Sequence, residues 1–258
     1  VNDGQADVIL GFEPVETLRA MTKASKDTLI ITNTRPVVPA NVSMRGDTYP
    51  DTDEVLEKIR AIHRSGDHLL TLINDILDLS KIEGGQLELE RIPMDIRQNT
   101  ADVVALWKQK SMQQGLEFNF RITNDVPDEA LGDPTRYRQI LNNLLSNAVK
   151  FTEEGHIGVR VSLARESRVT YTLRVEVSDT GIGIAADKQE AVFERFGQAT
   201  ADTTRKFGGA GLGLTIAHEL VTRAGGSIEI VNRPGGGLLQ TVSLPEAPEP
   251  EASDPDSA

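Results

Sequence analysis

Two asparagines and a lysine recur at helical spacing near the middle of the chain. Asn143, Asn147 and Lys150 lie in a stretch whose apolar residues repeat every three to four positions. The pattern predicts a helix over about 137–151 with both amides on one face. Amide oxygens suit a hard cation such as magnesium, and an ammonium suits phosphate oxygens. The segment could thus form one wall of a magnesium-nucleotide site, or its amides could simply be polar helix positions.

A carboxylate stands at the end of a predicted strand further along the chain. Residues 171–178 alternate apolar and polar side chains, and Asp179 follows them. A carboxylate at that place can accept a hydrogen bond from an exocyclic amine such as that of adenine. Gly181 and Gly183 allow the backbone to come close to a ligand. An ordinary Asp-Thr-Gly turn is the alternative explanation of this segment taken alone.

A glycine-rich loop runs directly into another predicted helix, over 212–223. Backbone N–H groups at such a helix start suit anionic phosphate. The loop is not a Walker loop, because no Gly-Lys-Ser/Thr follows. It is not a dinucleotide fingerprint either, because the strand that ends in a carboxylate comes before the glycines and not after them.

In their order and spacing, these segments resemble the catalytic and ATP-binding domain of sensor histidine kinases in the GHKL superfamily. The runs 143–150, 179–183, 193–196 and 208–214 look like its N box, first glycine box, F box and second glycine box. Four such agreements within about seventy residues are not an effect of composition. The resemblance implies an α/β fold, the GHKL (Bergerat) two-layer sandwich, over residues 91–245. It also implies ATP and Mg2+ as ligands.

The resemblance assigns roles to the polar residues of the first two boxes. Asn147 corresponds to the magnesium ligand, Asn143 to its companion on the nucleotide side, and Lys150 to a phosphate contact. Asp179 corresponds to the residue that reads adenine. These roles come from the family and not from spacing alone.

The remaining boxes supply the base pocket and a lid over the nucleotide. By resemblance, Gly181 and Gly183 shape the base pocket, and Phe193 and Phe196 anchor a lid over about 196–211. The hinge and the phosphate wall come from the second glycine box, namely Gly208, Gly209, Gly211, Leu212 and Gly213.

Two basic residues precede these glycines. Arg205 and Lys206 could neutralise the triphosphate or could be solvated loop charges. The sequence leaves both explanations open.

The apolar pattern of residues 53–82 predicts a long helix with an apolar seam. The seam alternates by fours and threes, as in a heptad pattern, at Val55, Ile59, Ile62, Gly66, Leu69, Ile73, Ile76 and Ser80. Because such a seam needs other helices to cover it, we expect a homodimer through this helix. It resembles the second helix of the kinase dimerisation domain, so residues 53–90 form a partial dimerisation domain by this interpretation.

The four histidines lack the context of a phospho-acceptor. His63, His68, His156 and His218 do not stand in a segment that resembles the acceptor helix of the family. The expectation is therefore a kinase catalytic region for two-component signalling whose acceptor helix is missing, with no catalytic histidine assigned. Its partner would be a response regulator or an intact kinase dimerisation domain. The alternative is an ATP-binding pseudokinase that regulates a partner. Another type of GHKL ATPase is disfavoured by the long helix.

Residues 1–52 have a different character. Strand-like runs at 6–11 and 28–32 enclose a helix that starts near Pro14, and the segment 33–39 is extended because it contains two prolines. This β-α-β piece resembles part of the gamma-type subunit of 2-oxoacid or indolepyruvate ferredoxin oxidoreductases. Two strands and one helix cannot bury both faces of a sheet, so we expect the piece to dock against another surface.

Composition narrows the choice of partners and compartment. The 258 residues have a formal net charge of −12, which disfavours nucleic acid and anionic membrane as partners. No stretch resembles a transmembrane span or a signal peptide, and the chain has no cysteine for a disulfide. We expect a cytoplasmic protein whose residues 246–258 form a disordered acidic tail.

Overall fold

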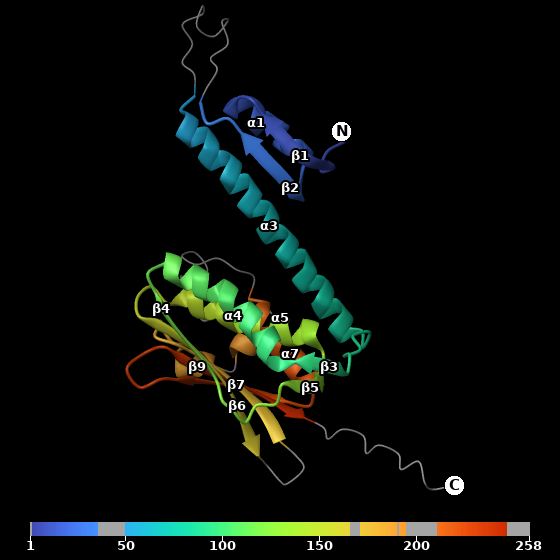
Figure 1. The fold of residues 1–258 in the computed structure, drawn as a ribbon, viewed down its shortest axis with the longest axis vertical. Coiled ribbons are helices and arrows are strands. Elements are labelled where there is room, and N and C mark those ends of the chain that lie inside the picture. Colours follow the sequence, from blue (N-terminus) through green and yellow to red (C-terminus); the bar gives the residue numbers. More distant parts are fainter. Residues whose placement is uncertain (1, 36–49, 166–170, 190, 195–210, 247–258) are drawn as a thin grey trace, which may run out of the picture. The chain divides into compact units, whose positions relative to one another are not determined.

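The structure is a computed structural model and describes residues 2–35, 50–165, 171–189, 191–194 and 211–246. It divides into two compact units, 1–74 and 75–258, and the division falls inside one long helix (Figure 1). The division into segments 1–52, 53–90, 91–245 and 246–258 remains a prediction. Of the expected tail 246–258, Glu246 belongs to the last strand instead, and residues 247–258 lie outside the described residues.

The first unit begins with the expected β-α-β arrangement. Two parallel strands, β1 (Ala6–Gly11) and β2 (Ala24–Thr32), enclose α1 (Pro14–Ala20) and a short 3-10 turn, η1 (Met21–Lys23). The helix starts where Pro14 occupies the first turn and the Glu13 carboxylate accepts from the backbone N–H of Glu16.

A small apolar cluster holds this unit together. Met21 packs with Val55 and Ile59 of α3 (Thr52–Glu83), and all three side chains are buried. The opposite face of the sheet is apolar and exposed, at Val8, Leu10, Phe12, Leu29 and Ile31. The sheet is therefore covered on one face only.

Helix α3 is continuous over 32 residues and carries the predicted seam. Beyond Ile59 the apolar side chains of the seam and its flanks are exposed, at Ile62, Leu69, Leu70, Ile73, Ile76 and Leu77. At the end of the helix Leu79 and Ile82 are buried in the core of the second unit. The apolar seam is thus buried near the start of the helix, exposed in its middle and buried again at its end.

The second unit is a two-layer α/β sandwich, as predicted. Its five-stranded sheet has the order β4-β6-β7-β9-β8, in which only the β4–β6 pair is parallel. The strands are β4 (Glu117–Ile122), β6 (His156–Arg165), β7 (Tyr171–Asp179), β8 (Ser227–Asn232) and β9 (Leu238–Glu246). Three helices cover one face (Figure 1), namely α4 (Ile96–Gln113), α5 (Pro134–Phe151) and α7 (Gly213–Arg223). The pair β3 (Ile92–Asp95) and β5 (Glu129–Gly132) forms a small antiparallel sheet.

Helix α5 shows why the layers pack. Asp133 caps it by accepting from the backbone N–H groups of Thr135 and Arg136, so the helix begins at Pro134. Its apolar face includes Leu144 and Leu145, both fully buried. The polar face of α5 remains accessible for a site.

Candidate nucleotide site

Asp179 is the last residue of β7 and is only 2% exposed. Its Oδ1 accepts from the backbone N–H of Gly181 at 2.8 Å and of Leu238 at 3.2 Å. Burial raises the pKa of this carboxyl, while the two backbone hydrogen bonds and the charge of Arg233 partly oppose that rise. No described residue donates to Oδ2 by a direct hydrogen bond, so that oxygen can accept from a ligand.

The glycines after Asp179 lie where a side chain would collide with neighbouring protein atoms. A Cβ on Gly181 would lie 2.2 Å from the carbonyl oxygen of Phe151, at the end of α5. Gly183 has φ +68, and a Cβ there would lie 2.9 Å from Oδ1 of Asn232. The loop is thus pressed between α5 and the end of β8. The predicted role of the two glycines in shaping a base pocket is compatible with this packing and remains a prediction.

The polar residues of α5 are half-buried along one helix. Asn143 donates through Nδ2 to the carbonyl oxygen of Gly213 at 3.0 Å. This bond uses the Nδ2 donor, and the Oδ1 of the same amide is a further acceptor. Burial lowers the pKa of Lys150, whose Nζ lies 4.9 Å from the centroid of the Phe151 ring. Asn147 is half-buried, one turn beyond Asn143.

The described part of the glycine-rich segment begins at Gly211, which has φ +71. Leu212 is 1% exposed and precedes α7, which begins at Gly213. The other predicted residues of the lid and loop lie outside the described residues, namely Phe196, Arg205, Lys206, Gly208 and Gly209.

Phe193, which was predicted to anchor a lid, is packed against α7. Phe193 lies in η3 (Ala191–Phe193), with its ring centroid 5.1 Å from that of His218 on α7. Thr215, which the sequence did not single out, donates from its hydroxyl to the carbonyl oxygen of Glu194 at 3.0 Å. These contacts attach the first two residues of the F box to α7.

Sequence reasoning also missed two residues where β8 passes into the turn to β9, namely Asn232, the last residue of β8, and Arg233, the first of the turn. Asn232 bonds to both backbone groups of Ile184, and Arg233 donates to the carbonyl oxygen of Asp179 at 2.7 Å. The available signal was the run Asn-Arg-Pro-Gly-Gly-Gly after a strand, which is typical of a tight turn. It does not reveal which loop the turn contacts.

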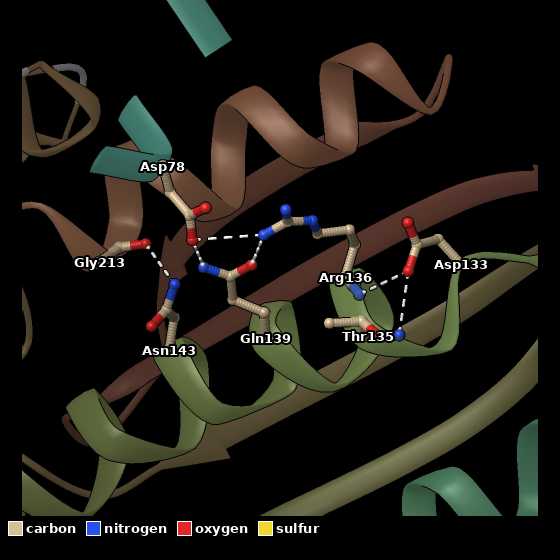
Figure 2. A network of polar contacts seen from close by, with 7 residues as sticks. All are labelled: Asp78, Asp133, Thr135, Arg136, Gln139, Asn143 and Gly213. Atoms are coloured by element: carbon tan, nitrogen blue, oxygen red, sulfur yellow. Dashed lines mark hydrogen bonds and ion pairs between the residues drawn. The ribbon is translucent and has the colours of Figure 1, made fainter. Parts of the chain in front are cut away.

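A polar network joins the end of α3 to the same helix α5 (Figure 2). The Oδ2 of Asp78 accepts from Nε2 of Gln139 at 2.8 Å and from Nη1 of Arg136 at 3.2 Å. Arg136 also donates to Oε1 of Gln139 at 2.7 Å. Helix α5 therefore connects the last turns of α3 at one end with Asn143 and Gly213 toward the other.

The fold and these contacts define a nucleotide-binding domain of the GHKL type. Residues 132–248 match the family model described as histidine kinase-, DNA gyrase B-, and HSP90-like ATPase, and ATP is the ligand of that domain. Residues 14–85 match the His Kinase A (phospho-acceptor) domain. The chain belongs to the sensor histidine kinases, with the phospho-acceptor region ahead of the ATPase domain.

Curated relatives agree with this membership. The chain is 43% identical over 181 residues to the signal transduction histidine-protein kinase BarA of Escherichia coli strain K12. The aligned region covers 70% of this chain and 20% of BarA. It is 40% identical over 193 residues to the sensor protein GacS of Pseudomonas syringae pv. syringae, and this region covers 75% of this chain and 21% of GacS. The chain thus spans about a fifth of the length of these relatives.

Solved structures show the same fold. Full-length ShkA in complex with AMPPNP is similar with a TM-score of 0.65 at 33% identity, over 79% of this chain and 41% of that one. The histidine kinase AdeS of Acinetobacter baumannii has a TM-score of 0.55 at 20% identity, over 90% and 94%. The second likeness concerns the fold alone.

The expectation of a missing phospho-acceptor helix is wrong. The match to the phospho-acceptor domain extends from residue 14 to residue 85, and over its described part the structure has α1, η1, β2 and α3. The expectation rested on the few residues beside each histidine, whereas the match covers the whole segment that contains His63 and His68. The pseudokinase alternative depended on the missing helix and is withdrawn with it. The likeness of residues 1–52 to an oxidoreductase subunit overlaps this match and remains untested.

Two features are absent from the described residues. Among them no helix is long and apolar enough to cross a membrane. The same residues contain no cluster of three or more His, Cys, Asp or Glu side chains that could hold a metal ion.

Proposed function

We propose that this chain transfers the γ-phosphoryl group of ATP to a histidine of its own phospho-acceptor region, as a step of two-component signalling. The observation that carries the proposal is the buried Asp179 carboxylate. Its Oδ1 is fixed by two backbone N–H groups, and its Oδ2 accepts from no described residue. This geometry suits an adenine amine, and the solved relative ShkA, which binds AMPPNP, supports a nucleotide at this place.

The polar face of α5 would receive the phosphates. Asn143 keeps its Oδ1 while its Nδ2 is bound to Gly213, and Lys150 supplies a positive charge. Phe193, Phe196, Arg205 and Lys206 would belong to the lid. The glycine box would line the phosphates through Gly208, Gly209, Gly211, Leu212 and Gly213.

Magnesium fits this donor set. Mg2+ is usually held by a few protein oxygens together with the phosphates of the substrate. The described residues offer no carboxylate cluster, so the amide oxygen of Asn147 would hold the ion together with ATP. When bound, the ion neutralises charge on the phosphates during transfer.

The transfer itself needs positioning and charge neutralisation more than covalent chemistry by the protein. An imidazole nitrogen of the acceptor attacks the γ-phosphorus. The bond from this phosphorus to the bridging oxygen breaks, and ADP leaves with the electron pair. His63 and His68 are the histidines of the matched region, and both lie on α3.

We further propose a homodimer through residues 53–82, because α3 exposes a long apolar stripe. A response regulator would then receive the phosphoryl group. A cytoplasmic location remains a prediction based on the need for ATP.

Labelling with [γ-32P]ATP tests the proposed transfer. We expect acid-labile, alkali-stable labelling of the full chain. One of the two variants His63→Gln and His68→Gln should lose this label, and so should the double variant. Asn147→Ala should abolish the labelling, whichever histidine is the acceptor. Bound ATP with no labelled protein, or undiminished labelling of the double histidine variant, would contradict the proposal.

A further inference from the structure

The turn between β8 and β9 braces both ends of the loop that follows Asp179. At the far end of the loop, Oδ1 of Asn232 accepts from the backbone N–H of Ile184 at 3.0 Å, and Nδ2 donates to the carbonyl oxygen of the same residue at 2.7 Å. The side-chain amide thus makes with Ile184 the two hydrogen bonds that the backbone of a neighbouring strand would make. Two bonds to one residue fix its position and its orientation.

At the near end of the loop the contact is to Asp179 itself. Nη1 of Arg233 donates to the Asp179 carbonyl oxygen at 2.7 Å, and the backbone N–H of Leu238 donates to Oδ1 at 3.2 Å. Gly237 is buried with φ +83, and a Cβ there would lie 2.1 Å from the Asp179 carbonyl oxygen. The turn and the loop therefore touch backbone to backbone, with no space for a side chain between them.

The turn is itself closed by hydrogen bonds. The backbone N–H of Arg233 donates to the carbonyl oxygen of Gly237 at 2.9 Å, and that of Gly236 donates to the carbonyl oxygen of Arg233 at 3.1 Å. A closed turn presents the Asn232 and Arg233 side chains to the loop in a fixed arrangement.

We infer that Asn232 and Arg233 are positioning residues of the adenine site, which aim the Oδ2 of Asp179 and hold the wall formed by residues 181–184. The inference rests on the proposed function, since it requires that Asp179 reads the base. Neither side chain needs to touch the nucleotide. Both belong to a segment outside the four motifs that identify the ATP site.

The consequence is a defect in base selection and not in phosphate binding. Inosine triphosphate carries a carbonyl where ATP carries the amine, so this position of the base accepts a hydrogen bond and cannot donate one to Asp179. A wild-type site that reads the amine prefers ATP. If Asp179 loses its brace, the preference shrinks while the phosphates bind as before.

The test measures the dissociation constants of ATP and inosine triphosphate, with Mg2+, for the full chain and its Asn232→Ala and Arg233→Ala variants. Asn124→Ala is the matched control, because Asn124 is an exposed asparagine in the loop after β4. We expect each turn variant to reduce the preference for ATP about tenfold, which corresponds to one lost hydrogen bond. The control should keep the wild-type ratio.

Other outcomes separate the two claims. A wild-type chain with no preference for ATP would overturn the role of Asp179 and the inference with it. A wild-type preference that persists in both turn variants would overturn the inference alone, and so would an equal loss of both nucleotides. If Asn232→Ala does not fold, Asn232→Asp keeps the acceptor for Ile184 and removes the donor, so the same ratio can be measured.

Discussion

The chain contains two sheets that are each covered on one face, and they differ in the chemistry of the other face. In the five-stranded sheet the face away from the helices carries polar side chains such as Arg160 and Arg174, which are exposed. In the β1–β2 sheet the uncovered face carries Val8, Leu10 and Leu29, each more than half exposed. A polar face is stable in water, whereas a contiguous apolar face favours a further covering layer.

The two units differ in whether they cover their own apolar surface. The second unit buries a continuous core between three helices and one sheet, from Leu79 to Val242. The first unit buries a cluster around Met21, Val55 and Ile59 and leaves its sheet and much of the α3 seam bare. Nucleotide binding belongs to the unit that needs no further layer.

A matched pair of isoleucines gives the largest expected effect. Ile157 on β6 is fully buried, and Ile31 on β2 is 49% exposed. Ile157→Ala should lower the free energy of unfolding by about 4 kcal/mol because it leaves a cavity. Ile31→Ala should change it by less than about 1 kcal/mol. Urea denaturation of both variants checks this, and equal losses would erase the distinction between the sheets.

The bare stripe of α3 provides the next test. If a second copy covers it, Ile73→Asp places a charge in the dimer interface twice. We expect the dimer dissociation constant to rise about a hundredfold, or about 3 kcal/mol. Asn74→Glu is the control, because Asn74 is an exposed residue outside the heptad seam. Sedimentation equilibrium measures both, and an unchanged dimer in Ile73→Asp would place the interface elsewhere.

Asp179→Ala should separate binding from stability within the second unit. We expect ATP affinity to fall about thirtyfold, or about 2 kcal/mol, because a charged hydrogen-bond acceptor is removed from the base. The variant should stay folded, since its core side chains are unchanged. Titration with a fluorescent ATP analogue measures the affinity, with the exposed Asp187→Ala as control. Unchanged affinity would refute the assignment of Asp179.

The smallest expected effect concerns pH. Burial, and then the charge of Asp78, raise the pKa of Asp75 above its ordinary value. A carboxyl whose pKa is raised by folding binds more protons in the folded state, so its contribution to stability is present at low pH. That contribution is lost as pH rises from the unfolded pKa, near about 4, through the raised value.

Asp75→Asn should therefore flatten this part of the stability profile. The free energy of unfolding at neutral pH should rise by at most about 0.5 kcal/mol, because solvent screens a half-buried group. Urea midpoints at pH 3 and pH 7 measure it, with the exposed Asp102→Asn as control. A variant with the wild-type slope would show that Asp75 is not the responsible group.

Much of the second unit could be predicted from apolar periodicity. The helix that carries Asn143 and the strand that ends at Asp179 were both predicted, because their buried faces repeat regularly along the sequence. The β3–β5 pair was not predicted, since its strands are four residues long and Pro93 interrupts the first.

The site was predictable only where a motif is local. Asn143 and Asp179 stand in recognisable runs, whereas the role of Asn232 depends on its contact with Ile184, which lies 48 positions away in sequence. No pattern around Asn232 indicates that contact. The phospho-acceptor region was missed for a related reason, because the residues beside His63 and His68 do not indicate it, whereas the family match extends over residues 14–85.

Helix α5 contains no glycine and no proline after its first residue. It is therefore a stiff rod of 18 residues, about 27 Å long. Arg136, held by Asp78, and Asn143, held to Gly213, are about two turns apart on this rod. A displacement of the last turns of α3 at Asp78 would therefore be passed along one continuous helix to Asn143 and Gly213.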